Sequence, residues 1–193
     1  GKWGVAVIRV SGQLAKVAIK KLTKKVLKPR EATLCKLYDH KNSVFDQAVV
    51  VFFEDKKSFT GEPVVEFQTH GSLSIISKLL DEISMIEGFR LAEPGEFTKR
   101  AYLGGKINLV QAEGLADLID SETEKQREQA LMHYGNLLSD KYFSWSEEIK
   151  TCLALIEASI DFSDEDIPKN LLNEIRKISL KIKVEINEFL KTE

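Results

Sequence analysis

The stretch FTGEPVVEFQTHGS, residues 59–72, contains the run VVEFQTH (64–70), which is typical of a buried β-strand but carries an acidic residue in its middle. Side chains of a strand alternate between its two faces. Glu66 therefore shares a face with Gln68, while Phe67 and its apolar neighbours share the other face. The carboxylate of Glu66 therefore has a polar neighbour on its own face of the strand.

A second strand-like run, GVAVIRV (4–10), repeats the pattern with a basic residue. Arg9 lies on the same face as Val5 and Val7. Burying a lone charge costs several kcal/mol, so Arg9 and Glu66 must be solvated, paired, or held for a ligand. The sequence pattern leaves these three alternatives open.

The elements around these strands indicate a mixed α+β order. We expect a helix from about residue 13 to 27, a strand at 44–53, a helix at 72–86 and a short helix at 96–103. Gly104 and Gly105 then end the short helix, and Asn108 with Gln111 has the spacing of a capping box that opens the next helix. The chain is thus predicted to be α+β, with a mixed-sheet domain over residues 1–104 and an all-helical segment over 105–193.

The helical segment shows two apolar stripes. Apolar residues recur every three or four positions from Leu131 to Ile160, which predicts one long amphipathic helix over about 121–160. Ser163 and Asp166 have the spacing of a cap for a second helix, whose stripe runs from Leu172 to Leu190.

Composition restricts the class of protein. The 193 residues are 43% apolar and 30% charged with a formal net charge of −2, so they do not indicate a general electrostatic attraction to nucleic acid or to an anionic membrane. No apolar run reaches the roughly 20 residues of a membrane span, and we expect a cytoplasmic protein. Cys35 and Cys152 are expected to be reduced, partly buried thiols.

The run LGGKINL places Lys106 directly after two glycines and before a helix start. A phosphate-binding loop of the Walker type needs a glycine at position 100 and Ser or Thr at position 107, and these positions hold Arg100 and Ile107. The run is therefore not a Walker loop. From its sequence alone, Lys106 is an exposed lysine in a loop that links two helices.

Four motifs in order resemble the MnmE (TrmE) family of tRNA modification GTPases. They are GVAVIRVSG, SFTGEPVVEFQTHGS, PGEFTKRAYLGGKINLVQAEGLADLIDSET and EASIDFSDEDI. The resemblance implies an N-terminal folate-binding domain, similar to aminomethyltransferase domains, that also forms a homodimer. It implies a helical domain interrupted by a Ras-like GTPase domain, which this chain is expected to lack. The opening GKWG and the loop LGGKINL depart from the usual family pattern.

The resemblance also assigns a cofactor site. Its folate-contacting arginine, glutamate and lysine correspond to Arg9, Glu66 and Lys106. The carboxylate of Glu66 would accept the two adjacent donors of a pterin ring, and the basic residues would meet the carboxylates of the glutamyl tail. The implied ligand is 5-formyl- or 5,10-methylene-tetrahydrofolate. GTP, Mg²⁺ and K⁺ belong to the absent GTPase domain, and no catalytic residue or metal site is assigned in this chain.

The implied partners are a second copy of the chain, a flavin-dependent protein of the MnmG (GidA) type, and tRNAs whose wobble uridine is modified. Two other functions stay open. The chain could be a free-standing folate-dependent aminomethyl transferase, or a structural dimerisation module in which Arg9 and Glu66 only pair. A P-loop encoded shortly after Glu193 would favour the GTPase.

Two further features are ambiguous. Residues 16–30 hold seven basic side chains and no acidic one, which suits either contact with tRNA phosphates or a solvated helix face. His70 suits either a ligand contact or a strand-end histidine satisfied by backbone groups, and we expect the second. His40 and His133 have no partner at metal-ligand spacing, so we expect no zinc site.

Overall fold

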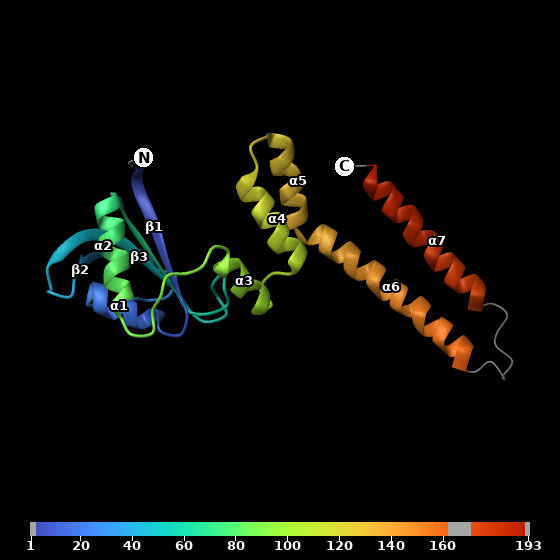
Figure 1. Ribbon diagram of the computed structural model, residues 1–193, viewed down its shortest axis with the longest axis horizontal. Helices are drawn as coiled ribbons and strands as arrows, with labels where there is room; N and C mark the ends of the chain where they lie inside the picture. Colours follow the sequence, from blue (N-terminus) through green and yellow to red (C-terminus); the bar gives the residue numbers. More distant parts are fainter. Residues whose placement is uncertain (1–2, 162–170, 192–193) are drawn as a thin grey trace. The chain divides into compact units, whose positions relative to one another are not determined.

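The computed structural model describes residues 3–161 and 171–191 of the chain. It divides into two compact units, Gly1–Ala112 and Glu113–Glu193. The first unit combines a sheet with helices and the second is helical, which confirms the α+β class (Figure 1).

Four strands form one sheet in the order β1-β4-β3-β2, and every neighbouring pair is antiparallel. The strands are β1 (Trp3–Ser11), β2 (Thr33–Tyr38), β3 (Val44–Phe53) and β4 (Val64–Gly71). The sequence analysis expected a mixed sheet, and this is wrong because all neighbouring strands are antiparallel. The one parallel pairing within residues 3–161 and 171–191 is an isolated bridge between Pro29 and Phe52. Strand β2 was not expected from the sequence.

Two helices, α1 (Ala15–Thr23) and α2 (Leu73–Ser84), pack on the same face of the sheet (Figure 1). Phe67 points toward them and is completely buried, as its place in the strand pattern predicts. Helix α1 is shorter than the expected 13–27 because Lys24 adopts a left-handed conformation with φ 57° and ends it. The opposite face of the sheet, which carries Glu66, is not covered by either helix.

The link between the first unit and the helical segment follows the sequence prediction. Helix α3 (Glu96–Leu103) ends at Gly104, whose N–H donates to the carbonyl of Arg100 over 2.8 Å. Asn108 Oδ1 accepts the N–H of Gln111 at 2.9 Å, and Gln111 Oε1 accepts the N–H of Asn108 at 3.0 Å. This reciprocal capping box opens α4 (Leu109–Asp120).

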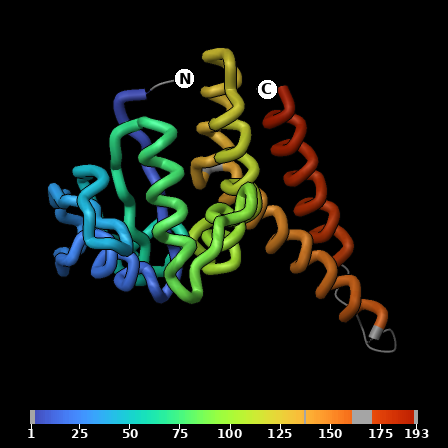
Figure 2. The backbone as a smooth tube through the Cα atoms, turned by 60° about the vertical axis from the view of Figure 1, so that its left-hand side comes forward, coloured from blue at the N-terminus to red at the C-terminus, as the bar shows by residue number. Residues whose placement is uncertain are grey.

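The second unit contains α5 (Glu124–Tyr134), α6 (Asn136–Asp161) and α7 (Leu171–Leu190) after α4. The single helix expected over 121–160 is wrong, because Gly135 takes an extended conformation with ψ 168° and separates α5 from α6. Helices α6 and α7 lie side by side (Figure 2), and Trp145 Nε1 donates to Glu185 Oε2 over 2.8 Å between them. The expected cap at residues 163 and 166 lies outside the described residues.

The structure also bears on the two cysteines and on the length of the apolar helices. Cys35 and Cys152 are both free and buried, as expected. None of the helices within residues 3–161 and 171–191 is long and apolar enough to cross a membrane.

Candidate ligand-binding site

Arg9 and Glu66 face each other across the two neighbouring strands β1 and β4. The distance between Arg9 Nε and Glu66 Oε1 is 2.9 Å, and the two side chains are 53% and 21% exposed. The pair therefore lies on the face of the sheet that α1 and α2 leave uncovered. Of the alternatives that the sequence left open, pairing is present and both groups also keep some contact with solvent.

The carboxylate of Glu66 retains unused hydrogen-bonding capacity. Its contact with Arg9 is an ion pair, and no other polar group of the described residues donates a hydrogen bond to it. A carboxylate can accept about four hydrogen bonds. Glu66 is therefore able to receive further donors without giving up a buried partner.

A pocket of about 240 Å³ opens beside this pair. Three aromatic side chains line it, from the end of β3, from the following loop and from α3: Phe53, Phe59 and Phe97. Lys57, Ser58 and Val64 complete the lining with Arg9 and Glu66. Aromatic walls beside a few polar groups suit a planar, hydrogen-bonding ring.

Lys106 lies on the neighbouring loop and is not among the residues that line this pocket. Its Nζ donates to the carbonyl of Lys56 over 3.0 Å. Its stem passes close to Gly61, where φ is 80° and an added Cβ would lie 3.2 Å from Lys106 Cγ. The structure thus brings Arg9 and Glu66 together and places Lys106 against the loop that forms one wall of the pocket.

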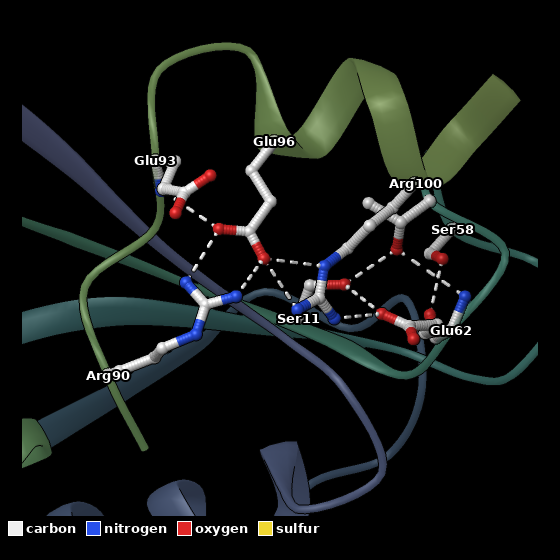
Figure 3. Close-up of polar contacts among 8 residues, drawn as sticks. Ser11, Ser58, Glu62, Arg90, Glu93, Glu96 and Arg100 are labelled. Carbon is white, nitrogen blue, oxygen red and sulfur yellow. Dashed lines mark hydrogen bonds and ion pairs between the residues drawn. The ribbon is translucent and has the colours of Figure 1, made fainter. Parts of the chain in front are cut away.

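A charged network beside the pocket fixes α3 (Figure 3). Glu96 accepts hydrogen bonds from Arg90 at 2.6 and 2.8 Å and from Arg100 at 2.7 and 3.0 Å. It also accepts the backbone N–H of Glu93 at 2.8 Å. Five donated bonds hold the start of α3 against the preceding loop.

The same network continues to the loop that follows β3 (Figure 3). Arg100 NH1 donates to Glu62 Oε2 over 2.9 Å, and Ser11 Oγ donates to the same oxygen over 3.0 Å. Ser11 Oγ also lies 2.7 Å from Thr60 Oγ1, and Ser58 Oγ bonds to the carbonyl of Glu62. These contacts join the end of β1, the 58–62 loop and α3, and Ser58 also lines the pocket.

The network alters the acidity of its members. The hydrogen bonds from Arg90, then the N–H of Glu93 and then Arg100 hold the pKa of Glu96 far below its usual range. The hydrogen bonds to Glu96 and then to Glu62 raise the pKa of Arg100. Glu96 and Arg100 are therefore both charged at neutral pH, and their ion pair holds the start of α3 in place.

The sequence analysis did not identify this network. Glu96 and Arg100 are separated by four positions inside a helix whose bounds were predicted, and this spacing is a recognised signal for an ion pair. Glu62 pairs with a residue 38 positions away, and no local pattern indicates that contact. Lys57, which lies on the pocket wall, was also missed.

Two histidines pair with buried carboxylates outside the pocket. His70 Nδ1 lies 2.6 Å from Asp46 Oδ1, so the expected satisfaction by backbone groups is wrong and the partner is a side chain. His40 Nδ1 lies 2.9 Å from Glu82 Oε1, which also receives Lys78 at 2.8 Å. Burial raises the pKa of Glu82, but the hydrogen bonds from Lys78 and His40 outweigh it, and the net pKa is lowered.

Comparison with protein families matches both halves of the chain. Residues 1–106 match the family described as the GTP-binding protein TrmE N-terminus. Residues 109–193 match the MnmE helical domain. The two matches together cover almost the whole sequence.

Curated relatives agree with this assignment. A tRNA modification GTPase MnmE of Dinoroseobacter shibae is 46% identical over 92% of this chain and 42% of its own length. Another, from Rickettsia bellii, is 45% identical over 98% of this chain and 43% of its own length. The mitochondrial 5-taurinomethyluridine-[tRNA] synthase subunit GTPB3 of Danio rerio is 40% identical over 100% of this chain and 39% of its own length. The chain thus spans about two fifths of the length of these relatives. It belongs to the MnmE (TrmE) family, as its four motifs indicated, and corresponds to the N-terminal and helical regions of that family.

Proposed function

We propose that this chain is the folate-binding and dimerising part of a tRNA modification GTPase. Residues 1–104 would hold a tetrahydrofolate derivative, and residues 105–193 would form the first part of the helical domain. The observation that carries the proposal is the carboxylate of Glu66, which is held in a strand beside an aromatic pocket and, within the described residues, contacts no polar group other than Arg9. Such an acceptor suits the paired donors of a pterin ring.

Each proposed residue has a separate role. Glu66 accepts the ring donors, and Arg9 holds the carboxylate in place. The phenylalanines of the pocket pack against the ring. Lys106 and Lys57 extend from the adjoining loops and attract the carboxylates of the folate tail.

The activity of the whole protein is part of the proposal. With a flavin-dependent partner of the MnmG type, it would transfer a one-carbon unit from folate to the wobble uridine of tRNA in the cytoplasm. GTP hydrolysis, with its Mg²⁺ and K⁺, would reside in a domain outside these 193 residues, because they contain no G-x-x-x-x-G-K-[ST] sequence. Calorimetry with GTP should accordingly give no binding, and measurable affinity would contradict this division of labour.

Exposed apolar residues support dimerisation through the first unit. Trp3, Val5 and Val7 are 62%, 63% and 51% exposed on β1, an edge strand of the sheet. Val7 lies on the same uncovered face as Arg9. An edge strand with an exposed apolar face is a common site of association.

The direct ion pair favours one other candidate, a structural dimerisation module in which Arg9 and Glu66 only hold each other. Glu66→Gln distinguishes the two. If Glu66 accepts pterin donors, the amide presents one donor to another donor, and affinity for 5-formyltetrahydrofolate should fall about 30-fold to 1,000-fold. If the pair is only structural, the substitution should lower the melting temperature and leave folate affinity unchanged.

The experiment is a calorimetric titration of 5-formyltetrahydrofolate into the wild type, Glu66→Gln, Arg9→Met and Lys106→Met, with a melting curve for each. Glu87→Gln is the matched control, since Glu87 is exposed and does not line the pocket. Wild-type folate affinity in a Glu66→Gln protein that melts much lower would overturn the proposed site.

A further inference from the structure

A run of basic side chains covers the outer side of α1 and the loop that follows it. We call this surface the basic face, and it consists of Lys16, Lys20, Lys21, Lys24, Lys25, Lys28 and Arg30. All seven side chains are exposed, whereas Ala18, Ile19 and Leu22 on the other side of α1 are buried in the core. The helix therefore presents only positive charge to solvent.

This charge is segregated from the rest of the chain. The net charge is −2 overall, so the remainder of the chain sums to −9 once these seven positive charges are set aside. Within residues 3–161 and 171–191, no carboxylate forms an ion pair with any side chain of the basic face. The carboxylates of the described residues therefore leave this surface open to an anion from another molecule.

Several of these cations are held in place without being neutralised. Lys24 Nζ lies 3.9 Å above the ring centre of Tyr38, and Lys16 Nζ lies 5.3 Å above that of Phe52. Lys25 Nζ and an Arg30 NH2 group donate to backbone carbonyls over 3.2 and 2.9 Å. These contacts restrict the side chains in advance, which lowers the entropy lost when they bind an anion.

The fold itself gains little from the arrangement. Lys20 and Lys21 lie in the last turn of α1, where a cation is favourable, but Lys16 lies in the first turn, where the helix dipole opposes it. Lys16 and Lys20 are also like charges four positions apart, which is destabilising. Stability of the helix does not account for the basic face, whereas recognition of a polyanion does.

We propose that the basic face binds the phosphate groups of a structured RNA, which, on the function proposed above, is the tRNA substrate. The contacts are to phosphates and not to bases, because Phe52 is buried and Lys24 occupies the space above the ring of half-buried Tyr38. Binding through phosphates alone is independent of sequence and strongly dependent on salt.

The test compares two triple variants of the whole chain. Lys20, Lys21 and Lys28 are changed to Gln in the first variant. These three side chains are exposed and form no ion pair or hydrogen bond with side chains of the described residues. Lys125, Lys177 and Lys183, which are exposed lysines of the helical unit, are changed to Gln in the control. Both variants alter the net charge equally, so any difference between them reports on location.

Binding of a fluorescent tRNA transcript is measured by anisotropy over a range of salt concentrations. The basic-face variant should lose about 10-fold to 100-fold in affinity at low salt, and its log–log salt slope should fall by about 2 to 3. The control should retain wild-type affinity and slope. Equal effects of the two variants, or no tRNA binding by the wild type, would overturn the proposal.

Two further measurements distinguish this proposal from membrane binding and from the folate-binding proposal. Binding of the wild type to vesicles containing phosphatidylserine, lost in the basic-face variant while tRNA binding is unchanged, would assign the surface to membranes and overturn the RNA proposal. Titration of 5-formyltetrahydrofolate tests the folate site independently, because Arg9 and Glu66 are unchanged in both variants. Wild-type folate affinity with weakened tRNA binding is the expected combination.

Discussion

Arg9 and Glu66 are direct cross-strand partners, with Arg9 Nε 2.9 Å from Glu66 Oε1 and the arginine more than half exposed. Ion pairs in this setting contribute little to stability, because solvent screens the charges and two side chains must be ordered. The pair is therefore better suited to orienting a carboxylate than to holding the sheet together.

Arg9→Met should consequently change the free energy of unfolding by no more than about 1 kcal/mol. Folate affinity should fall, since the carboxylate loses the cation that orients it. A double-mutant cycle with Glu66→Gln, followed by calorimetry and chemical denaturation, should give strong coupling in folate binding and weak coupling in stability. Strong coupling in stability alone would identify the pair as structural.

Glu96→Gln should lower the melting temperature at neutral pH, because it removes the charge that Arg90 and Arg100 share. The pKa of Glu96 is lowered in the folded state, so its contribution is present above the unfolded pKa of about 4.3 and is lost as pH falls toward the folded value. The difference between the wild type and the variant should therefore shrink progressively as pH falls below about 4. Melting curves from pH 7 to pH 2.5 check this, with Glu87→Gln as control. A difference that stays constant with pH would contradict the role of the charge.

Gly114→Ala should destabilise the helical unit, even though alanine favours helices by about 1 kcal/mol over glycine. A Cβ at Gly114 would lie 2.5 Å from the backbone nitrogen of Tyr134 and 2.8 Å from His133. Unlike a flexible side chain, a helix backbone cannot rotate out of the way, so the whole of α5 would have to shift away from α4. We expect this shift to lower the free energy of unfolding by about 1 to 3 kcal/mol. Chemical denaturation measures the change. Glu113→Ala, at the exposed neighbouring position, should be neutral or stabilising, and the same result for Gly114→Ala would contradict the close packing.

Val7→Lys should weaken the proposed dimer. Val7 is 51% exposed on the face of β1 that α1 and α2 do not cover, and a charge there would have to be desolvated in an interface. Sedimentation velocity over a range of protein concentrations should show a shift from dimer to monomer. Leu73→Lys is the control, since Leu73 is 70% exposed at the start of α2 on the opposite side of the sheet. An equal effect of both substitutions would exclude the β1 face as the specific contact.

Local patterns accounted for much of the fold. The period of two assigned the faces of β1 and β4, and the capping box at Asn108 marked the start of α4, because these features depend on neighbouring residues only. Strand β2 was missed because Lys36 interrupts a short apolar run. The alternation of the strand nevertheless places Lys36 on the exposed side and Cys35 in the core. The break at Gly135 was missed because the apolar spacing continues from α5 into α6, and periodicity does not register a change of direction.

The sequence by itself determined the family, the α+β order and the face on which Arg9 and Glu66 each lie. Only the tertiary structure decided that they are partners, because strand periodicity fixes a side chain's face but antiparallel register fixes its neighbour. The same holds for Glu62 and Arg100, which are joined across 38 positions when the 58–62 loop folds against α3. Contacts between distant segments depend on how the whole chain closes, and so the wall of the pocket could not be read from any single motif.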